Sequence, residues 1–175
     1  MAGKKILFVI APANFRDEEY EAPKKILEAA GHQVVTCSID RKLCTGMFGA
    51  KVMPALKVSE VKPFFYQGLV IAGGSGTPAL WESEELLGLI GQFFLEKKLV
   101  AAICLAPAIL AKAGILKGRK ATVWSSVLDK KAIEILKEGG ATFLPTEVVR
   151  DGIIVTASGP EAAGKFGQRI LEVLG

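Results

Sequence analysis

Cys104 lies between two apolar segments of different character. Residues 99–103 form a short apolar run typical of a buried strand, whereas 105–114 has a proline near its start and a glycine at its end, as helices prefer. A tight strand-to-helix turn would present the sulfur at the carboxyl edge of a sheet, where backbone N–H groups and the helix dipole favour a thiolate. The pattern indicates a candidate nucleophile. The alternative is a structural cysteine, because free Cys is among the most buried residue types.

Acidic residues near the start of the chain could serve such a nucleophile. Asp17, Glu18, Glu19 and Glu21 open a segment with helical spacing, and acidic side chains there usually complement the helix dipole in solvent. A glutamate buried beside the thiol would behave differently. Desolvation would raise its pKa, and it could then carry a proton as a general acid or base.

The run 73–78, with the sequence GGSGTP, is a loop in which the backbone can approach another group closely. It has neither the spacing of a dinucleotide fingerprint nor the lysine of a P-loop. We therefore predict that it brings N–H groups to the sulfur rather than to a phosphate. The N–H groups of Gly74 and Leu105 would then form an oxyanion hole.

Segments typical of strands and helices alternate along the chain, which predicts an α/β fold with a mostly parallel sheet and helices on both faces. We expect strands at 5–10, 33–38, 68–72, 99–103 and 122–123 and helices at 17–30, 83–97, 105–114, 126–138 and 161–174. Ser83 is the expected N-cap of its helix, and Pro23 predicts a kink or a first-turn position. The helix at 17–30 thus holds the acidic residues.

Two further segments predict hairpins, and the direction of the parallel strands predicts at which edge of the sheet a ligand site forms. Residues 40–62 are irregular and suggest a small β excursion, whereas Asp-Gly at 151–152 stands between two β-rich runs. Ligands of open α/β sheets bind beyond the carboxyl ends of the strands. The loops expected to meet there are 11–19, 73–78, the turn at Cys104, and 158–160.

Composition limits the classes of protein. The 175 residues are half hydrophobic and carry a net charge of +4, which predicts a single domain over 1–175. Basic residues are scattered without interleaved aromatics, so no nucleic-acid partner is expected. No apolar run reaches the ~18 residues of a membrane span, and the apolar start is interpreted as the first strand rather than a signal peptide. Three cysteines and one histidine predict a reducing cytoplasm and no metal site.

The chain resembles the ThiJ/PfpI superfamily over nearly its whole length. This resemblance implies a flavodoxin-like three-layer sandwich, related to class I glutamine amidotransferases, that is usually a homodimer or a higher oligomer. It also implies Cys104 as nucleophile and Glu19 as active-site acid, because the family's glutamate lies four residues before the helix proline. Pocket residues expected beside them are Gly73, Ala106, Trp124, Ser158 and Pro160. The motifs that carry the resemblance are 13–19 (ANFRDEE), 70–74 (VIAGG), 101–107 (AAICLAP), 113–120 (AGILKGRK) and 151–160.

Histidines that the superfamily uses are replaced in this chain. Protease-like members have a histidine directly after the nucleophile, where Leu105 stands, and deglycase-like members have one where Trp124 stands. The single histidine, His32, falls in the turn after the first helix, where a surface role is expected. Ser158 also stands where relatives often carry arginine. No Cys–His dyad is expected within the chain.

Three functions follow from these residues. The first is a glyoxalase- or deglycase-like enzyme, in which Cys104 attacks a small reactive carbonyl substrate without a cofactor. The alternative is a redox-responsive or chaperone-like protein whose Cys104 meets an oxidant and becomes a sulfinate. Intracellular peptide hydrolysis is less favoured, because a leaving amine needs a proton donor that Leu105 cannot supply. A glutamine amidotransferase would need a downstream His-x-Glu, which the chain lacks.

Overall fold

A mostly parallel sheet crosses the computed structural model, which describes residues 2–175. Along the sheet its strands are β11 (Val148–Asp151), β12 (Ile154–Ala157), β8 (Leu99–Ile103), β7 (Gly68–Ile71), β1 (Lys5–Val9), β3 (Gln33–Ser38) and β6 (Leu56–Lys57). Every neighbouring pair is parallel except the antiparallel hairpin of β11 and β12. The parallel sheet and the hairpin around 151–152 are therefore confirmed.

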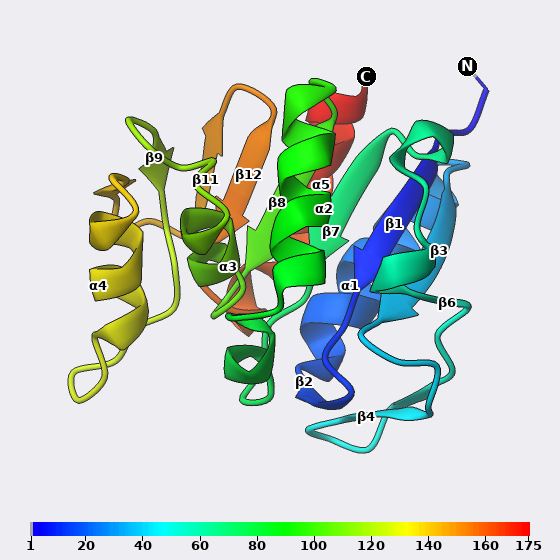
Figure 1. Ribbon diagram of the computed structural model, residues 1–175, viewed down its shortest axis with the longest axis horizontal. Helices are drawn as coiled ribbons and strands as arrows, with labels where there is room; N and C mark the ends of the chain where they lie inside the picture. The colour runs from blue at the N-terminus through cyan, green and yellow to red at the C-terminus, as the bar shows by residue number, and fades with distance from the viewer. Residues whose placement is uncertain (1) are drawn as a thin grey trace.

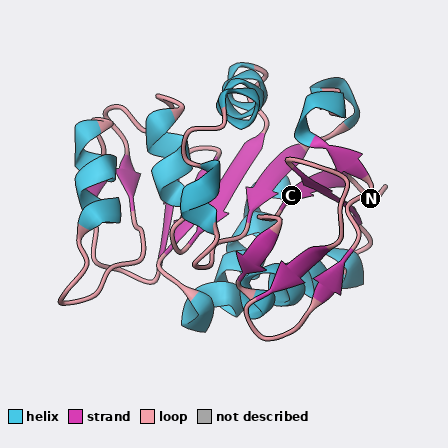
Figure 2. Ribbon diagram, turned by 60° about the horizontal axis from the view of Figure 1, so that its bottom comes forward, coloured by secondary structure: helices cyan, strands magenta, loops and turns pink. Residues whose placement is uncertain are grey.

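Helices cover both faces of this sheet. The two on one face, α1 (Asp17–Ala29) and α5 (Ala163–Leu174), pack against each other, whereas α2 (Glu84–Leu95) and α3 (Pro107–Lys112) lie on the other, with α4 (Lys131–Glu138) beside α3 (Figure 1). Figure 2 shows helices above and below the strands. The predicted three-layer sandwich is thus confirmed. Among the described residues, no helix has the length and apolar character needed to cross a membrane.

The central strands are apolar throughout because both of their faces are covered. All residues of β7 and β8 are buried, as are residues 6–9 of β1, which is the pattern expected of inner parallel strands. In the helix layer, α1 continues through Pro23, which lies beyond the first turn of this helix. The expectation that Pro23 occupies a first-turn position is therefore wrong. A Cβ at Gly167 of α5 would lie 3.1 Å from the Pro23 Cα, so glycine permits this close helix contact.

Two smaller sheets extend the fold. One consists of β2 (Ala13–Phe15), β4 (Cys44–Gly46) and β5 (Lys51–Val52), with β4 parallel to β2 and antiparallel to β5. This confirms a hairpin within 40–62, whereas β2 was not predicted. The other pairs β9 (Lys120–Ala121) with β10 (Thr142–Phe143). Short 3₁₀ turns lie at Val58–Glu60, Pro63–Phe65, Thr77–Leu80 and Pro160–Ala162.

Side-chain hydrogen bonds displace two predicted elements. The strand expected at 122–123 is wrong by two residues, because the Thr122 N–H donates to the Thr156 hydroxyl (3.0 Å) rather than to a strand. The helix expected from 126 begins only at Lys131. The residues at which that helix was expected to begin instead form a turn, in which the Ser126 hydroxyl accepts from the N–H groups of Leu128 and Asp129. Such side-chain bonds compete with helix formation. The Ser83 N-cap is confirmed, since its hydroxyl accepts from the Leu86 N–H (3.4 Å).

Carboxyl ends of the parallel strands meet at the lower edge of Figure 1, where β2 and β4 also lie. The chain reaches Cys104 directly after β8 and the glycine-rich loop shortly after β7. The first turn of α1 follows β2 at the same edge. The sheet therefore brings together the acidic segment, the glycine-rich loop and the cysteine turn, as predicted.

Candidate active site

Cys104 occupies a strained turn between β8 and α3. Its φ of +64° lies in the left-handed region, which costs a non-glycine residue roughly 1–2 kcal/mol. The turn is held by backbone bonds on both sides: the Cys104 N–H donates to the Ala157 carbonyl (2.9 Å), and its carbonyl accepts from the Trp124 N–H (2.9 Å). The residue is 7% exposed. This is the tight strand-to-helix turn expected from the sequence.

Glycine is required where the loop after β7 passes Cys104. A Cβ at Gly73 would lie 2.5 Å from the Cys104 Cβ and 2.6 Å from Glu19 Oε2, distances that no side chain tolerates. Gly74 follows with a φ of +118°. Its N–H and that of Leu105 lower the pKa of the Cys104 thiol. Both residues predicted to supply an oxyanion hole line the same cavity as Cys104.

Glu19 is the buried glutamate that faces this turn. It is 0% exposed in the first turn of α1, and Oε2 accepts from the Gly73 N–H (2.8 Å). Within residues 2–175, Oε1 has no hydrogen-bond partner of standard geometry. Burial raises the pKa of the Glu19 carboxyl to about 7, opposed by the neighbouring Cys104 thiol and the Gly73 N–H. Near neutral pH this carboxyl can therefore both take up and release a proton.

The thiol is less acidic than the sequence predicts. Burial, and then the charge of Glu19, raises the pKa of Cys104, whereas the N–H groups of Gly74 and Leu105 lower it. The expectation that backbone N–H groups and the helix dipole favour a thiolate is corrected accordingly, because burial outweighs the N–H groups. Two such close acids titrate as a pair, so the ionisation of Cys104 depends on whether Glu19 holds a proton.

A cavity of about 190 Å³ opens onto the sulfur. Of the residues expected here, Cys104, Glu19, Gly74, Leu105, Trp124 and Pro160 line it. Gly73 does not line the cavity, but its N–H donates to Glu19 Oε2. Ala106, which is fully buried immediately before α3, does not line it. Ser158 lies instead in a neighbouring cavity of about 240 Å³ with Trp124 and Pro160.

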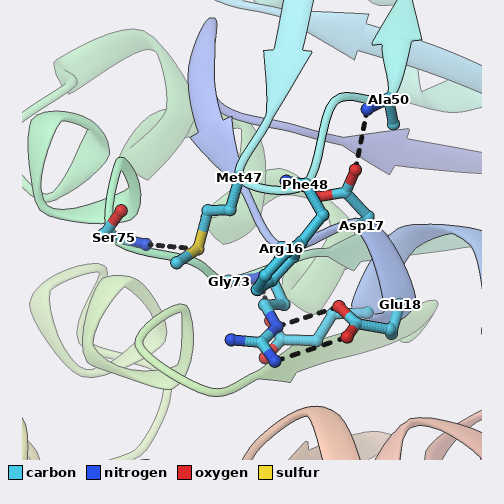
Figure 3. Close-up of polar contacts among 9 residues, drawn as sticks. Arg16, Asp17, Glu18, Met47, Phe48, Ala50, Gly73 and Ser75 are labelled. Carbon is cyan, nitrogen blue, oxygen red and sulfur yellow. Dashed lines mark hydrogen bonds and ion pairs between the residues drawn. The ribbon is translucent and has the colours of Figure 1, made fainter.

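Three further lining residues, Arg16, Met47 and Ser75, were missed by the sequence analysis. Met47 reaches the site on the turn between β4 and β5, and its sulfur accepts from the Ser75 N–H (3.5 Å; Figure 3). Asp17 fixes that turn from α1: its two oxygens accept from the N–H groups of Phe48 (2.9 Å) and Ala50 (2.8 Å). Arg16 and Ser75 had a signal, since they belong to the loops 11–19 and 73–78 that were expected at the site, whereas Met47 had none.

The remaining chemically active side chains lie elsewhere. His32 precedes β3 at the opposite edge of the sheet, where its Nδ1 accepts from the Lys4 N–H (3.0 Å). Cys37 and Cys44 are free and fully buried in β3 and β4, and burial raises the pKa of both thiols. No group of three or more His, Cys, Asp or Glu within residues 2–175 is arranged to hold a metal ion.

Comparison with known proteins confirms the family resemblance. The model of the DJ-1/PfpI family matches residues 4–173. An uncharacterized protein of Methanocaldococcus jannaschii, MJ0967, is 41% identical and covers 99% of this chain and 84% of its own length. Deglycase PfpI of Pyrococcus furiosus is 35% identical over 89% of this chain and 90% of that protein. The crystal structure of a ThiJ/PfpI domain protein from Brachyspira murdochii has a TM-score of 0.93 at 32% identity, covering 99% of this chain and 98% of that one.

Proposed function

The chain belongs to the DJ-1/PfpI family, and we propose that it is a cysteine-dependent enzyme that acts on small reactive carbonyl compounds. The single observation that carries this proposal is the pairing of Cys104 with a fully buried Glu19 beside a cavity of about 190 Å³. A cavity of that size, about six water volumes at ~30 Å³ each, suits an α-oxoaldehyde rather than a folded polypeptide. One relative is named a deglycase, and this name agrees with a carbonyl substrate.

Cys104, Glu19 and the two N–H groups can together account for every proton and electron pair in the addition of the sulfur to an aldehyde. Cys104 transfers its proton to the Glu19 carboxylate as the sulfur attacks the aldehyde carbon. A C–S bond forms and the carbonyl electron pair moves to oxygen, where the N–H groups of Gly74 and Leu105 stabilise the negative charge. Glu19 then returns the proton to that oxygen, giving a hemithioacetal. A carboxyl with a pKa of about 7 suits both transfers at neutral pH.

No histidine is needed for this addition, but its absence weakens peptide hydrolysis. Leu105 and Trp124 line the cavity where a histidine would have to stand, and a leaving amine needs a proton from a positioned acid. Glu19 would have to serve alone, in a fully buried position. Carbonyl addition has no leaving amine, so it makes the smaller demand on the site.

Oxidation of Cys104 is the second candidate function, favoured by Glu19 Oε1, which has no hydrogen-bond partner of standard geometry within residues 2–175. A sulfinate has acceptor oxygens that a protonated Glu19 and the N–H groups of Gly74 and Leu105 could satisfy. This reaction needs an external oxidant such as a peroxide. It also needs a thiolate, which the raised pKa of Cys104 disfavours in the free protein.

The test is methylglyoxal consumption by the wild type and by Cys104→Ser, Glu19→Gln and Cys37→Ser variants. We expect Cys104→Ser to abolish consumption and Glu19→Gln to slow it by about 10²–10⁴-fold, as for loss of a general acid–base group. Cys37→Ser is the matched control and should retain the wild-type rate per folded molecule. A wild-type rate no higher than that of Cys104→Ser would overturn the proposal. Mass spectrometry of peroxide-treated protein would then test oxidation.

A further inference from the structure

Arg16 is the single cationic side chain among the residues that line the Cys104 cavity. It precedes α1, and its N–H donates to the Gly73 carbonyl (2.8 Å), which ties it to the glycine-rich loop. Glu19, Gly74 and Cys104 line the same space. The hydrogen bond to Glu18, and then the charges of Glu18, Glu19 and Cys104, raise the pKa of the Arg16 guanidinium. A fixed positive charge therefore adjoins the nucleophile.

Two contacts hold the guanidinium in one orientation. Nε and Nη2 donate to the two carboxylate oxygens of Glu18 (2.8 and 3.3 Å), and the guanidinium carbon lies 4.6 Å from the centre of the Phe48 ring (Figure 3). Phe48 belongs to the turn that Asp17 fixes. A guanidinium oriented in this way before ligand arrives loses less side-chain entropy on binding.

Donor capacity remains on Arg16 after these contacts. Nη1 makes no hydrogen bond within residues 2–175, and guanidinium offers five N–H donors in all. Glu18 does not line the cavity, and its side chain is 49% exposed against 27% for Arg16. Solvent screens the Glu18 charge more strongly than the Arg16 charge. The cavity therefore meets the positive member of the ion pair.

We infer that Arg16 is an anion-recognition residue of the Cys104 cavity, which selects small carbonyl compounds that carry a carboxylate next to the carbon attacked by sulfur. The inference rests on the proposed function in taking the Cys104 sulfur as the reacting atom. Guanidinium binds carboxylate through charge-assisted hydrogen bonds. Glyoxylate is the smallest compound of this class, and it differs from methylglyoxal by a carboxylate in place of the acetyl group.

Alkylation of Cys104 by two matched reagents tests the inference without any turnover. Iodoacetate and iodoacetamide present the same reactive carbon and differ in a carboxylate against a neutral amide. The quantity measured is the ratio of their rate constants at Cys104, followed by mass spectrometry at one pH in the wild type, Arg16→Gln and Glu18→Gln. Iodoacetamide is the internal control for an intact, accessible thiol.

We expect Arg16→Gln to lower the iodoacetate-to-iodoacetamide ratio by roughly fivefold to tenfold, and Glu18→Gln to raise it, because the guanidinium loses its competing carboxylate. The ratio in Arg16→Lys should fall between those of the wild type and Arg16→Gln, since lysine keeps the positive charge but lacks the planar pair of N–H donors of guanidinium. Glyoxylate should protect Cys104 from iodoacetamide at lower concentration than methylglyoxal in the wild type, and this preference should disappear in Arg16→Gln.

An unchanged reagent ratio in Arg16→Gln, with unchanged iodoacetamide reactivity, would overturn the inference. That result is distinguishable from failure of the proposed function, which is read from methylglyoxal consumption in wild type and Cys104→Ser. A Cys104-dependent enzyme with no anion preference would refute only the role of Arg16. A strong anion preference without consumption of either methylglyoxal or glyoxylate would refute the carbonyl enzyme and leave Arg16 as the recognition residue of a binding site.

Discussion

The first turn of α1 holds two buried carboxylates that face two different regions. Asp17 faces the turn at 46–50 and has both oxygens occupied by backbone N–H groups. Glu19 faces the Cys104 turn, where one oxygen accepts from Gly73 and the other lacks a partner within residues 2–175. A buried polar group without a partner is costly. The difference separates a structural anchor from the carboxyl to which we assign proton transfer.

Backbone conformation separates the two regions in the same way. The turn at 46–50 places its positive φ on a glycine, Gly49, whereas the other region places one on Cys104 itself. Strain at a non-glycine residue persists where the surroundings fix it, and here Ala157 and Trp124 do so through backbone bonds. The two regions meet at the cavity, which Met47 lines from one and Cys104 from the other.

Removing the anchor should have the largest effect on stability. Asp17→Ala leaves the N–H groups of Phe48 and Ala50 without their charged acceptor, and we expect the free energy of unfolding to fall by about 4 kcal/mol, since hydrogen bonds to charged groups contribute about 1.5–3 kcal/mol each. Urea unfolding at neutral pH measures this. A loss below about 1 kcal/mol would show that Asp17 is not an anchor.

Glu19→Gln should instead stabilise the protein, and only at higher pH. The folded-state pKa of about 7 exceeds the ordinary value of 4.5, so the wild type loses stability as pH rises from about 4.5 to 7 and stays less stable above that. Glutamine cannot ionise and can still accept from the Gly73 N–H. The free energy of unfolding of the variant minus that of the wild type should be roughly 3 kcal/mol larger at pH 8 than at pH 4.

Urea unfolding of both proteins at pH 4 and pH 8 measures that gain. Parallel changes in stability with pH would mean that Glu19 does not carry a raised pKa. Together with the loss of activity expected for the same variant, a gain in stability would identify Glu19 as a residue retained for chemistry at a cost to folding.

Glu18→Gln should have the smallest effect. Its carboxylate bonds Arg16 at the surface, with a side chain 49% exposed, and exposed ion pairs contribute about 0–1 kcal/mol. We expect the free energy of unfolding to change by less than about 0.5 kcal/mol at any pH between 4 and 8. A larger loss would make the ion pair, rather than Asp17, the element that holds this part of the molecule.

Much of the fold is predictable because its signals are local. Apolar runs indicate β1, β7 and β8, and Asp-Gly indicates the hairpin of β11 and β12. The missed boundaries have a common cause: at Thr122 and Ser126, hydrogen bonds to side chains replace the backbone pattern that the sequence suggests. Strand β2 was missed because its partner β4 lies far along the chain, and pairing of that kind leaves no local pattern.

The site is predictable where a motif carries it. Cys104, Glu19, Gly74 and Leu105 were expected together and are brought together. Met47 was missed, because its approach depends on a turn held by Asp17 from another element. The acidity of Cys104 was also misjudged, since the balance between burial and N–H groups depends on packing that the sequence does not display.

The central claim is that Cys104 and Glu19 titrate as one pair, and the pH dependence of Cys104 alkylation tests it most directly. Iodoacetamide rates would be measured from pH 5 to 10 in wild type, Glu19→Gln and the matched surface variant Glu18→Gln. We predict an inflection near pH 7 in wild type and in Glu18→Gln, from the Glu19 carboxyl. Glu19→Gln should lack it. The same profile in all three proteins would contradict the coupling.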